Sequence, residues 1–130
     1  MSSLVMTSGV FAEAPIKMLF FYQNGCRWCM QMEEILHEPD MEGLLSRRIQ
    51  VIRINVQGRE KTSVLGKEGR DLAQEFHVYG TPTIILVGGG EKELLRIPGA
   101  LSKKDFLDLV CRYLPDMGKK TGCGKKNGTL

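Results

Sequence analysis

Residues 20–29 read FFYQNGCRWC, and this stretch decides how the chain is interpreted. It links an apolar, aromatic run at residues 18–22 to a Cys-x-x-Cys motif through three turn-forming residues. A short apolar run bounded by turn residues is typical of a strand buried on both faces. Apolar residues then recur at helical spacing after Cys26, at positions Cys29, Met32, Ile35 and Leu36. The pattern therefore predicts a buried strand followed by a helix that begins at the first cysteine.

The position of the two cysteines at the start of a helix predicts redox chemistry. Backbone N–H groups and the positive end of the helix dipole stabilise an anion there, so Cys26 is expected to be exposed and thiolate-prone. Cys29, one turn further on, is expected to be more buried. Such a pair can attack a substrate disulfide through Cys26, form a mixed disulfide and resolve it through Cys29. Both residues are candidate catalytic residues and would form a redox-active disulfide.

The two residues between the cysteines are candidates for substrate binding. Arg27 would place a cation within reach of the Cys26 thiolate, and Trp28 would offer an apolar plate beside it. Either residue could instead simply face the solvent.

Two other interpretations of the Cys-x-x-Cys motif are a zinc site and purely structural cysteines. A structural zinc site needs four ligands, usually in two close pairs. Here Cys111 lies on a core-facing helical stripe, Cys123 lies in a Gly- and Lys-rich tail, and His37 and His77 are isolated. We therefore expect no metal and no organic cofactor, and we assign no role to either histidine. Cys111 is expected to fill the core, whereas Cys123 is an incidental thiol or a third redox cysteine.

The rest of the chain predicts an α/β domain with the order βα-βα-ββα. Pro39 should end or kink the first helix, with a short helical turn restarting at Asp40. The expected elements that follow are a buried strand at 50–56, an irregular excursion at 57–69, a helix at 71–77, a hairpin of strands 83–87 and 93–97, and a helix capped by Ser102 and ended by Pro115. The inward residues of that last helix would be Phe106, Leu107, Val110, Cys111 and Leu114.

Length and composition fit one globular domain. The 130 residues are 42% hydrophobic and carry a formal net charge of +3, without a nucleic-acid recognition motif. No apolar run approaches the roughly 18 residues that span a bilayer, so we expect no stable membrane insertion. The predicted divisions are a lead-in or signal remnant at 1–15, a domain at 16–115 and a flexible basic tail at 116–130.

Several motifs together resemble the thioredoxin superfamily. They are FFYQNGCRWC at 20–29, the strand residues 52–56, YGTPT at 79–83, and RIPG at 96–99 followed by LSKKDF at 101–106. The chain is most similar to the exported branch, which includes Sox-type thioredoxins and thiol:disulfide interchange proteins. The resemblance implies a thioredoxin fold, with a central mixed sheet of four to five strands flanked by helices. It also implies that the Thr81–Pro82 bond is cis and that this loop packs against the two cysteines and presents backbone groups to an extended substrate peptide; the alternative is a trans proline that opens a strand.

The chain departs from the family pattern at three sites. Phe20 occupies the position of a buried acid, which leaves the proton acceptor for Cys29 in doubt, and Arg53 corresponds to a basic residue near that acid. Gly25 replaces the usual Trp before the first cysteine. The excursion at 57–69 lengthens the chain, as it does in the exported branch.

The resulting expectation is a monomeric thiol:disulfide oxidoreductase, a reductase of protein disulfides supplied with electrons by a membrane or thioredoxin-type donor. It would be exported or periplasmic, with a cytoplasmic location as the alternative, and would bind no nucleic acid. Other roles that remain open are a disulfide isomerase or oxidant, and a thioredoxin-fold binding or chaperone module without turnover.

Overall fold

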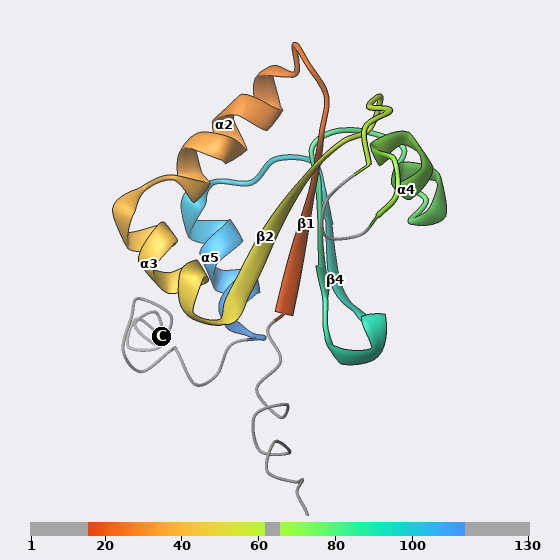
Figure 1. Cartoon of the computed structure of the whole chain (residues 1–130). Coiled ribbons are helices and arrows are strands. Elements are labelled where there is room, and N and C mark those ends of the chain that lie inside the picture. Colours follow the sequence, from red (N-terminus) through yellow and green to blue (C-terminus); the bar gives the residue numbers. More distant parts are fainter. Residues whose placement is uncertain (1–15, 62–65, 114–130) are drawn as a thin grey trace, which may run out of the picture.

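Four strands form one mixed sheet in the computed structural model, which describes residues 16–61 and 66–113 (Figure 1). Their order across the sheet is β2-β1-β3-β4. Along the chain the elements are β1 (Ile16–Tyr22), α2 (Arg27–Leu36), α3 (Pro39–Arg48), β2 (Ile49–Asn55), α4 (Gly69–Glu75), β3 (Thr83–Val87), a 3₁₀ turn (Gly89–Glu91), β4 (Glu93–Pro98) and α5 (Lys103–Cys111). This is the thioredoxin fold, and it forms a single domain.

The strand that precedes the cysteines lies in the middle of the sheet. β1 runs parallel to β2 and antiparallel to β3, so both of its edges are paired. Its side chains alternate between two cores: Met18 and Phe20 pack on one face of the sheet, and Leu19 and Phe21 pack on the other. The prediction of a strand buried on both faces is confirmed.

Helices cover both faces of the sheet. Figure 1 shows α2, α3 and α5 on one side and α4 on the other. The first group contributes Met32, Met41 and Phe106 to the larger core, whereas α4 contributes Leu72 and Ala73 to the smaller one. Burial of these apolar faces stabilises the fold by roughly 25 cal/mol per Å² of apolar surface, and it holds the start of α2 at the end of β1.

Three sequence expectations are wrong in detail. Pro39 does not delay the next helix: α3 begins at Pro39 and spans ten residues, because a helix leaves the N–H of its first residue unpaired and proline has none. α4 begins at Gly69 rather than at residue 71. β2 is not fully buried, because it lies at the edge of the described sheet and exposes Gln50 and Arg53.

Some expectations fall outside the described residues. These concern Leu114, Pro115, Cys123 and the segments at 1–15 and 116–130, so the proposed domain boundaries stay predictions. Within the described part, Ser102 does cap α5, with its hydroxyl accepting from the backbone N–H of Asp105 at 3.1 Å. Cys111 is half-buried at the end of α5 and packs against the larger core.

Candidate active site

A tight turn carries the chain from the end of β1 into α2. Gly25 has a φ of 80°, a left-handed conformation that costs glycine little and other residues more. The turn closes with the backbone N–H of Cys26 donating to the carbonyl oxygen of Gln23 at 3.3 Å. This conformation is the physical reason why glycine suits the position before the first cysteine.

Cys26 caps the N-terminus of α2 with its sulfur atom. The backbone N–H of Cys29 donates to Cys26 Sγ at 3.1 Å, in the way that a Ser or Asp oxygen usually accepts at this position. The two cysteines form a disulfide with their Cα atoms 5.2 Å apart. Cys29 is only 4% exposed and Cys26 is half-buried. The donor and the helix dipole both favour negative charge on Cys26 when the disulfide is reduced.

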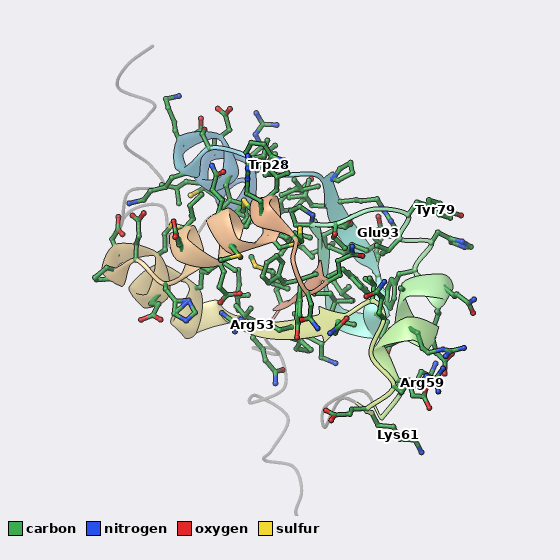
Figure 2. The ribbon with its side chains drawn as sticks, turned by 90° about the horizontal axis from the view of Figure 1, so that it is seen from above. Trp28, Arg53, Arg59, Lys61, Tyr79 and Glu93 are labelled. Carbon is green, nitrogen blue, oxygen red and sulfur yellow. A yellow bond between two sulfur atoms is a disulfide. The ribbon has the colours of Figure 1, made fainter. Side chains whose placement is uncertain are left out.

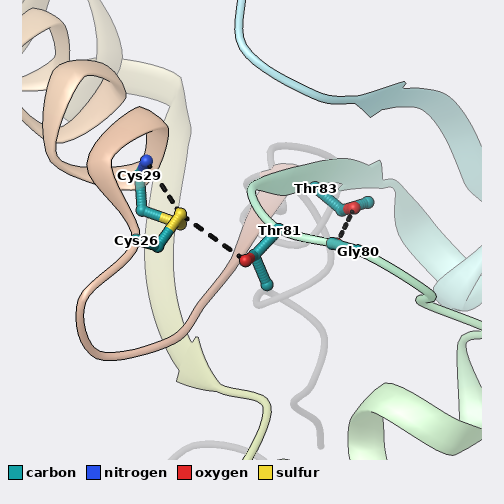
Figure 3. The surroundings of a disulfide bond; sticks show 5 residues. All are labelled: Cys26, Cys29, Gly80, Thr81 and Thr83. Atoms are coloured by element: carbon teal, nitrogen blue, oxygen red, sulfur yellow. Dashed lines mark hydrogen bonds between the residues drawn. A yellow bond between two sulfur atoms is a disulfide. The ribbon is translucent and has the colours of Figure 1, made fainter.

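The loop before β3 supplies a second donor to the same sulfur. Figure 3 shows the Thr81 hydroxyl pointing at Cys26 Sγ from a segment 55 residues further along the chain, with an oxygen–sulfur distance of 3.5 Å. The Thr81–Pro82 peptide bond is cis. Thr83 donates its hydroxyl to the Gly80 carbonyl oxygen at 2.7 Å, which closes the loop on itself. The fold therefore brings Thr81 and the two cysteines together.

Arg27 and Trp28 lie at the exposed start of α2. Trp28 is 53% exposed and Met30 is 63% exposed, so large apolar side chains flank the redox pair, and Figure 2 shows Trp28 at this end of the helix. The Arg27 side chain has no hydrogen bond or ion pair with the described residues, and Arg27 is exposed. The roles predicted for Arg27 and Trp28 in substrate binding stay predictions.

An arginine that sequence reasoning missed ties β4 to the segment that leads to Thr81. Arg96 donates to the carbonyl oxygen of Phe76 at 2.8 Å and forms an ion pair with Glu93 at 2.8 Å. The hydrogen bond from Arg96 lowers the pKa of Glu93, and the same bond raises the pKa of Arg96. Strand alternation would place two residues three apart on opposite faces. The pairing of β3 with β4 shifts register at Leu86/Val87, which breaks that alternation and removes the sequence signal.

A second missed group lies beside the disulfide. A cavity of about 440 Å³ is lined by both cysteines, by Phe20 and by Glu33 and Arg53. The Arg53 guanidinium binds the Glu33 carboxylate through two nitrogens, with Nε–Oε2 at 2.8 Å and a second nitrogen at 2.6 Å from Oε2. The sequence signal for Glu33 was its spacing, four residues after Cys29 on the same helical face.

The described residues contain no group of three or more His, Cys, Asp or Glu side chains placed to hold a metal ion. His37 bonds to Glu33, with Nδ1 3.1 Å from Oε2, and His77 ends α4 in a left-handed conformation with a φ of 56°.

Comparisons with known proteins agree with this fold. The thioredoxin-like domain family matches residues 12–113. A thioredoxin from Thermus thermophilus superposes with a TM-score of 0.65 at 26% identity, covering 83% of this chain and 80% of that one. A thioredoxin-fold protein from Helicobacter pylori gives a TM-score of 0.66 at 22% identity over 74% of this chain, which spans about two thirds (66%) of that protein. A DsbH oxidoreductase superposes with a TM-score of 0.64 at 17% identity, covering 83% of this chain and 78% of that one. No curated protein sequence matches this chain.

Proposed function

Since this chain belongs to the thioredoxin-like family, we propose that it is a thiol:disulfide oxidoreductase that reduces disulfides in proteins. The observation that carries the proposal is the Cys26–Cys29 disulfide at the N-terminus of α2, with Thr81 donating to Cys26 Sγ from the opposite loop. Cys26 is half-buried and its sulfur accepts both hydrogen bonds, whereas Cys29 is buried. This arrangement suits an attacking and a resolving thiol.

The reaction needs only the two cysteines and the substrate. The Cys26 thiolate attacks one sulfur of the substrate disulfide, forming a Cys26–substrate bond and releasing the other substrate sulfur as a thiolate. The Cys29 thiolate then attacks Cys26 Sγ, which forms the intramolecular disulfide and releases the second substrate thiolate. The protein dithiol loses two electrons and the substrate disulfide gains them. A dithiol donor must reduce the protein again before the next cycle.

The surroundings of the pair suit a protein substrate. Exposed Trp28 and the backbone of the Thr81–Pro82 loop would bind an extended peptide on either side of Cys26, and Arg27 would contribute a cation. We also propose that the protein acts as a monomer in an exported or periplasmic setting, with a membrane or thioredoxin-type electron donor. No helix among the described residues has the length and apolar character to cross a bilayer.

The two donors to Cys26 favour a second candidate, an isomerase or oxidant. Stabilising the reduced thiolate makes a disulfide more oxidising, and the sequence has no His between the cysteines to add to that effect. We expect a reduction potential of about −180 to −270 mV, where reductase and isomerase activity are both accessible. Equilibration with glutathione buffers measures it, and a value near −120 mV, typical of a strong oxidant, would replace the reductase by an enzyme that inserts disulfides.

Trapping experiments test the proposal. Reduction of insulin by dithiothreitol should be faster with the protein than without it. Cys29→Ser should accumulate a mixed disulfide with insulin, and the matched variant Cys26→Ser should not.

Pro82→Ala should slow turnover and prolong mixed disulfides. Insulin reduction at the uncatalysed rate would favour a binding or chaperone module, and faster alkylation of Cys29 than of Cys26 would reverse the two roles.

A further inference from the structure

Resolution of the mixed disulfide requires a proton acceptor for Cys29. Its side chain is 4% exposed, so bulk water has little access to the thiol. A buried thiol loses its proton reluctantly because the thiolate is poorly solvated there. The strand residue that faces this site is Phe20, which is 1% exposed and can neither accept nor donate a proton. The acceptor must therefore come from another element.

The cavity beside Cys29 offers one carboxylate among the described residues. Its titratable or charged lining groups are Cys26, Cys29, Glu33 and His37 from α2, Tyr22 from β1 and Arg53 from β2. Glu33 lies one helical turn after Cys29, about 6 Å along the helix axis, whereas His37 lies about 12 Å away. The Glu33 side chain is 34% exposed, so it contacts both the cavity and the solvent.

Two side chains, Arg53 and His37, position the Glu33 carboxylate. Arg53 is the sheet partner of Phe20 in the parallel pairing of β1 and β2, and Figure 2 shows it on β2 beneath α2. Its guanidinium donates to both carboxylate oxygens of Glu33, at 3.1 and 2.8 Å. His37 holds Oε2 from the other side at 3.1 Å. These contacts fix the carboxylate on the wall of the cavity.

We propose that Glu33 is the proton acceptor for Cys29 in the resolving step, acting through water in the cavity that both side chains line. A volume of about 440 Å³ has room for several waters, and carboxylate, thiol and guanidinium groups supply the polar partners that such waters need. Glu33 on α2 would thus supply the carboxylate that Phe20 on β1 cannot. The inference rests on the proposed thiol:disulfide exchange.

The step balances without a further reactant. The Cys29 thiol gives its proton through water to Glu33, which becomes a neutral carboxylic acid. The Cys29 thiolate attacks Cys26 Sγ, the Cys26–substrate bond breaks, and the substrate leaves as a thiolate. Glu33 then returns its proton to the departing thiolate or to the solvent, which its exposed edge reaches.

Stopped-flow mixing of the reduced protein with 5,5′-dithiobis(2-nitrobenzoate) separates the two thiols. Attack by Cys26 releases the first coloured thiolate, and resolution by Cys29 releases the second. Glu33→Gln should slow the second phase at pH 7 at least tenfold, since general-base catalysis contributes about 10² to 10⁴, and should leave the first phase within twofold. The difference should shrink as the pH rises, because hydroxide then takes a growing share of the protons from Cys29 without the carboxylate. Arg53→Met should also slow the second phase, because it removes the guanidinium that fixes the Glu33 carboxylate on the wall of the cavity.

Neighbouring variants make the outcome specific. Glu34→Gln removes the same charge from the adjacent, exposed residue, which does not line the cavity, and should leave both phases unchanged. Glu33→Asp should retain part of the rate. Equal second phases in Glu33→Gln and Glu34→Gln at every pH would overturn the inference while leaving the proposed function intact. So would a loss of equal size at every pH, which indicates altered packing, or a loss in His37→Gln alone. A wild-type protein without a Cys26-dependent first phase would instead overturn the proposed function.

Discussion

Replacing Thr81 by valine removes one hydrogen bond to the sulfur of Cys26 and almost nothing else. Valine has the shape of threonine with a methyl group in place of the hydroxyl, and both residues are β-branched. The lost contact is the 3.5 Å bond from Thr81 Oγ1 to Cys26 Sγ. Thr81 is half-buried, so water replaces the hydroxyl only in part. The substitution therefore isolates the contribution of this donor to the redox equilibrium.

The size of the effect follows from the difference between the two redox states. A hydrogen bond to a neutral group contributes about 0.5–1.5 kcal/mol and one to a charged group about 1.5–3 kcal/mol. The disulfide sulfur is neutral and the Cys26 thiolate is charged, so the donor stabilises the reduced form by about 1 kcal/mol more than the oxidised form. Since 1.4 kcal/mol corresponds to 30 mV for this couple, Thr81→Val should make the potential about 20 mV more negative. The equilibrium constant with glutathione should change about fivefold.

Equilibration with glutathione buffers, read by mass after acid quenching and alkylation, measures the shift. Thr83→Val is the matched control, because the Thr83 hydroxyl donates to the Gly80 carbonyl oxygen and not to sulfur. It should reduce stability with a potential within about 5 mV of wild type. Alkylation of Cys26 at neutral pH should also be slower in Thr81→Val, since less thiolate is present. An unchanged potential in Thr81→Val, or a shift toward more oxidising values, would refute the reasoning.

Three further predictions concern the fold around the site. Gly69→Ala should destabilise the protein by about 2–3 kcal/mol in urea unfolding, because a Cβ there would lie well inside 3.0 Å of the Asn55 carbonyl oxygen; a loss below about 0.5 kcal/mol would contradict the close contact. Glu93→Gln should flatten the acid limb of stability, because the bond from Arg96 lowers the pKa of Glu93. The contribution of this bond is present above the usual 4.5 and is lost as the pH falls through the lowered value, so urea midpoints from pH 6 to 3 should fall less in the variant than in wild type. His77→Gly should raise the unfolding free energy by about 0.5–1 kcal/mol, because His77 has a φ of 56° and glycine adopts this conformation without strain. A decrease in the unfolding free energy would show that the imidazole makes a compensating contact.

The local parts of the fold could be read from the chain because they depend on neighbours in sequence. The apolar run at 18–22 specified a central strand, and the turn with Gly25 and the helical spacing after Cys26 specified the helix that follows. The predicted element boundaries were wrong where a residue type suits more than one local conformation. Pro39 breaks a helix interior but suits a first turn, and Gly69 reads as a breaker although its missing Cβ lets α4 approach the Asn55 backbone.

The sequence by itself determined the pair of cysteines and its place at the start of a helix, because a three-residue spacing and a helix N-terminus are local properties. Only the tertiary structure decided what surrounds that pair. The Thr81 hydroxyl reaches Cys26 Sγ across 55 residues of chain, and Arg53 reaches Glu33 across 20. Such contacts depend on which strands pair and in what register. The apolar patterns that determine strand pairing do not indicate which polar side chains the pairing brings together.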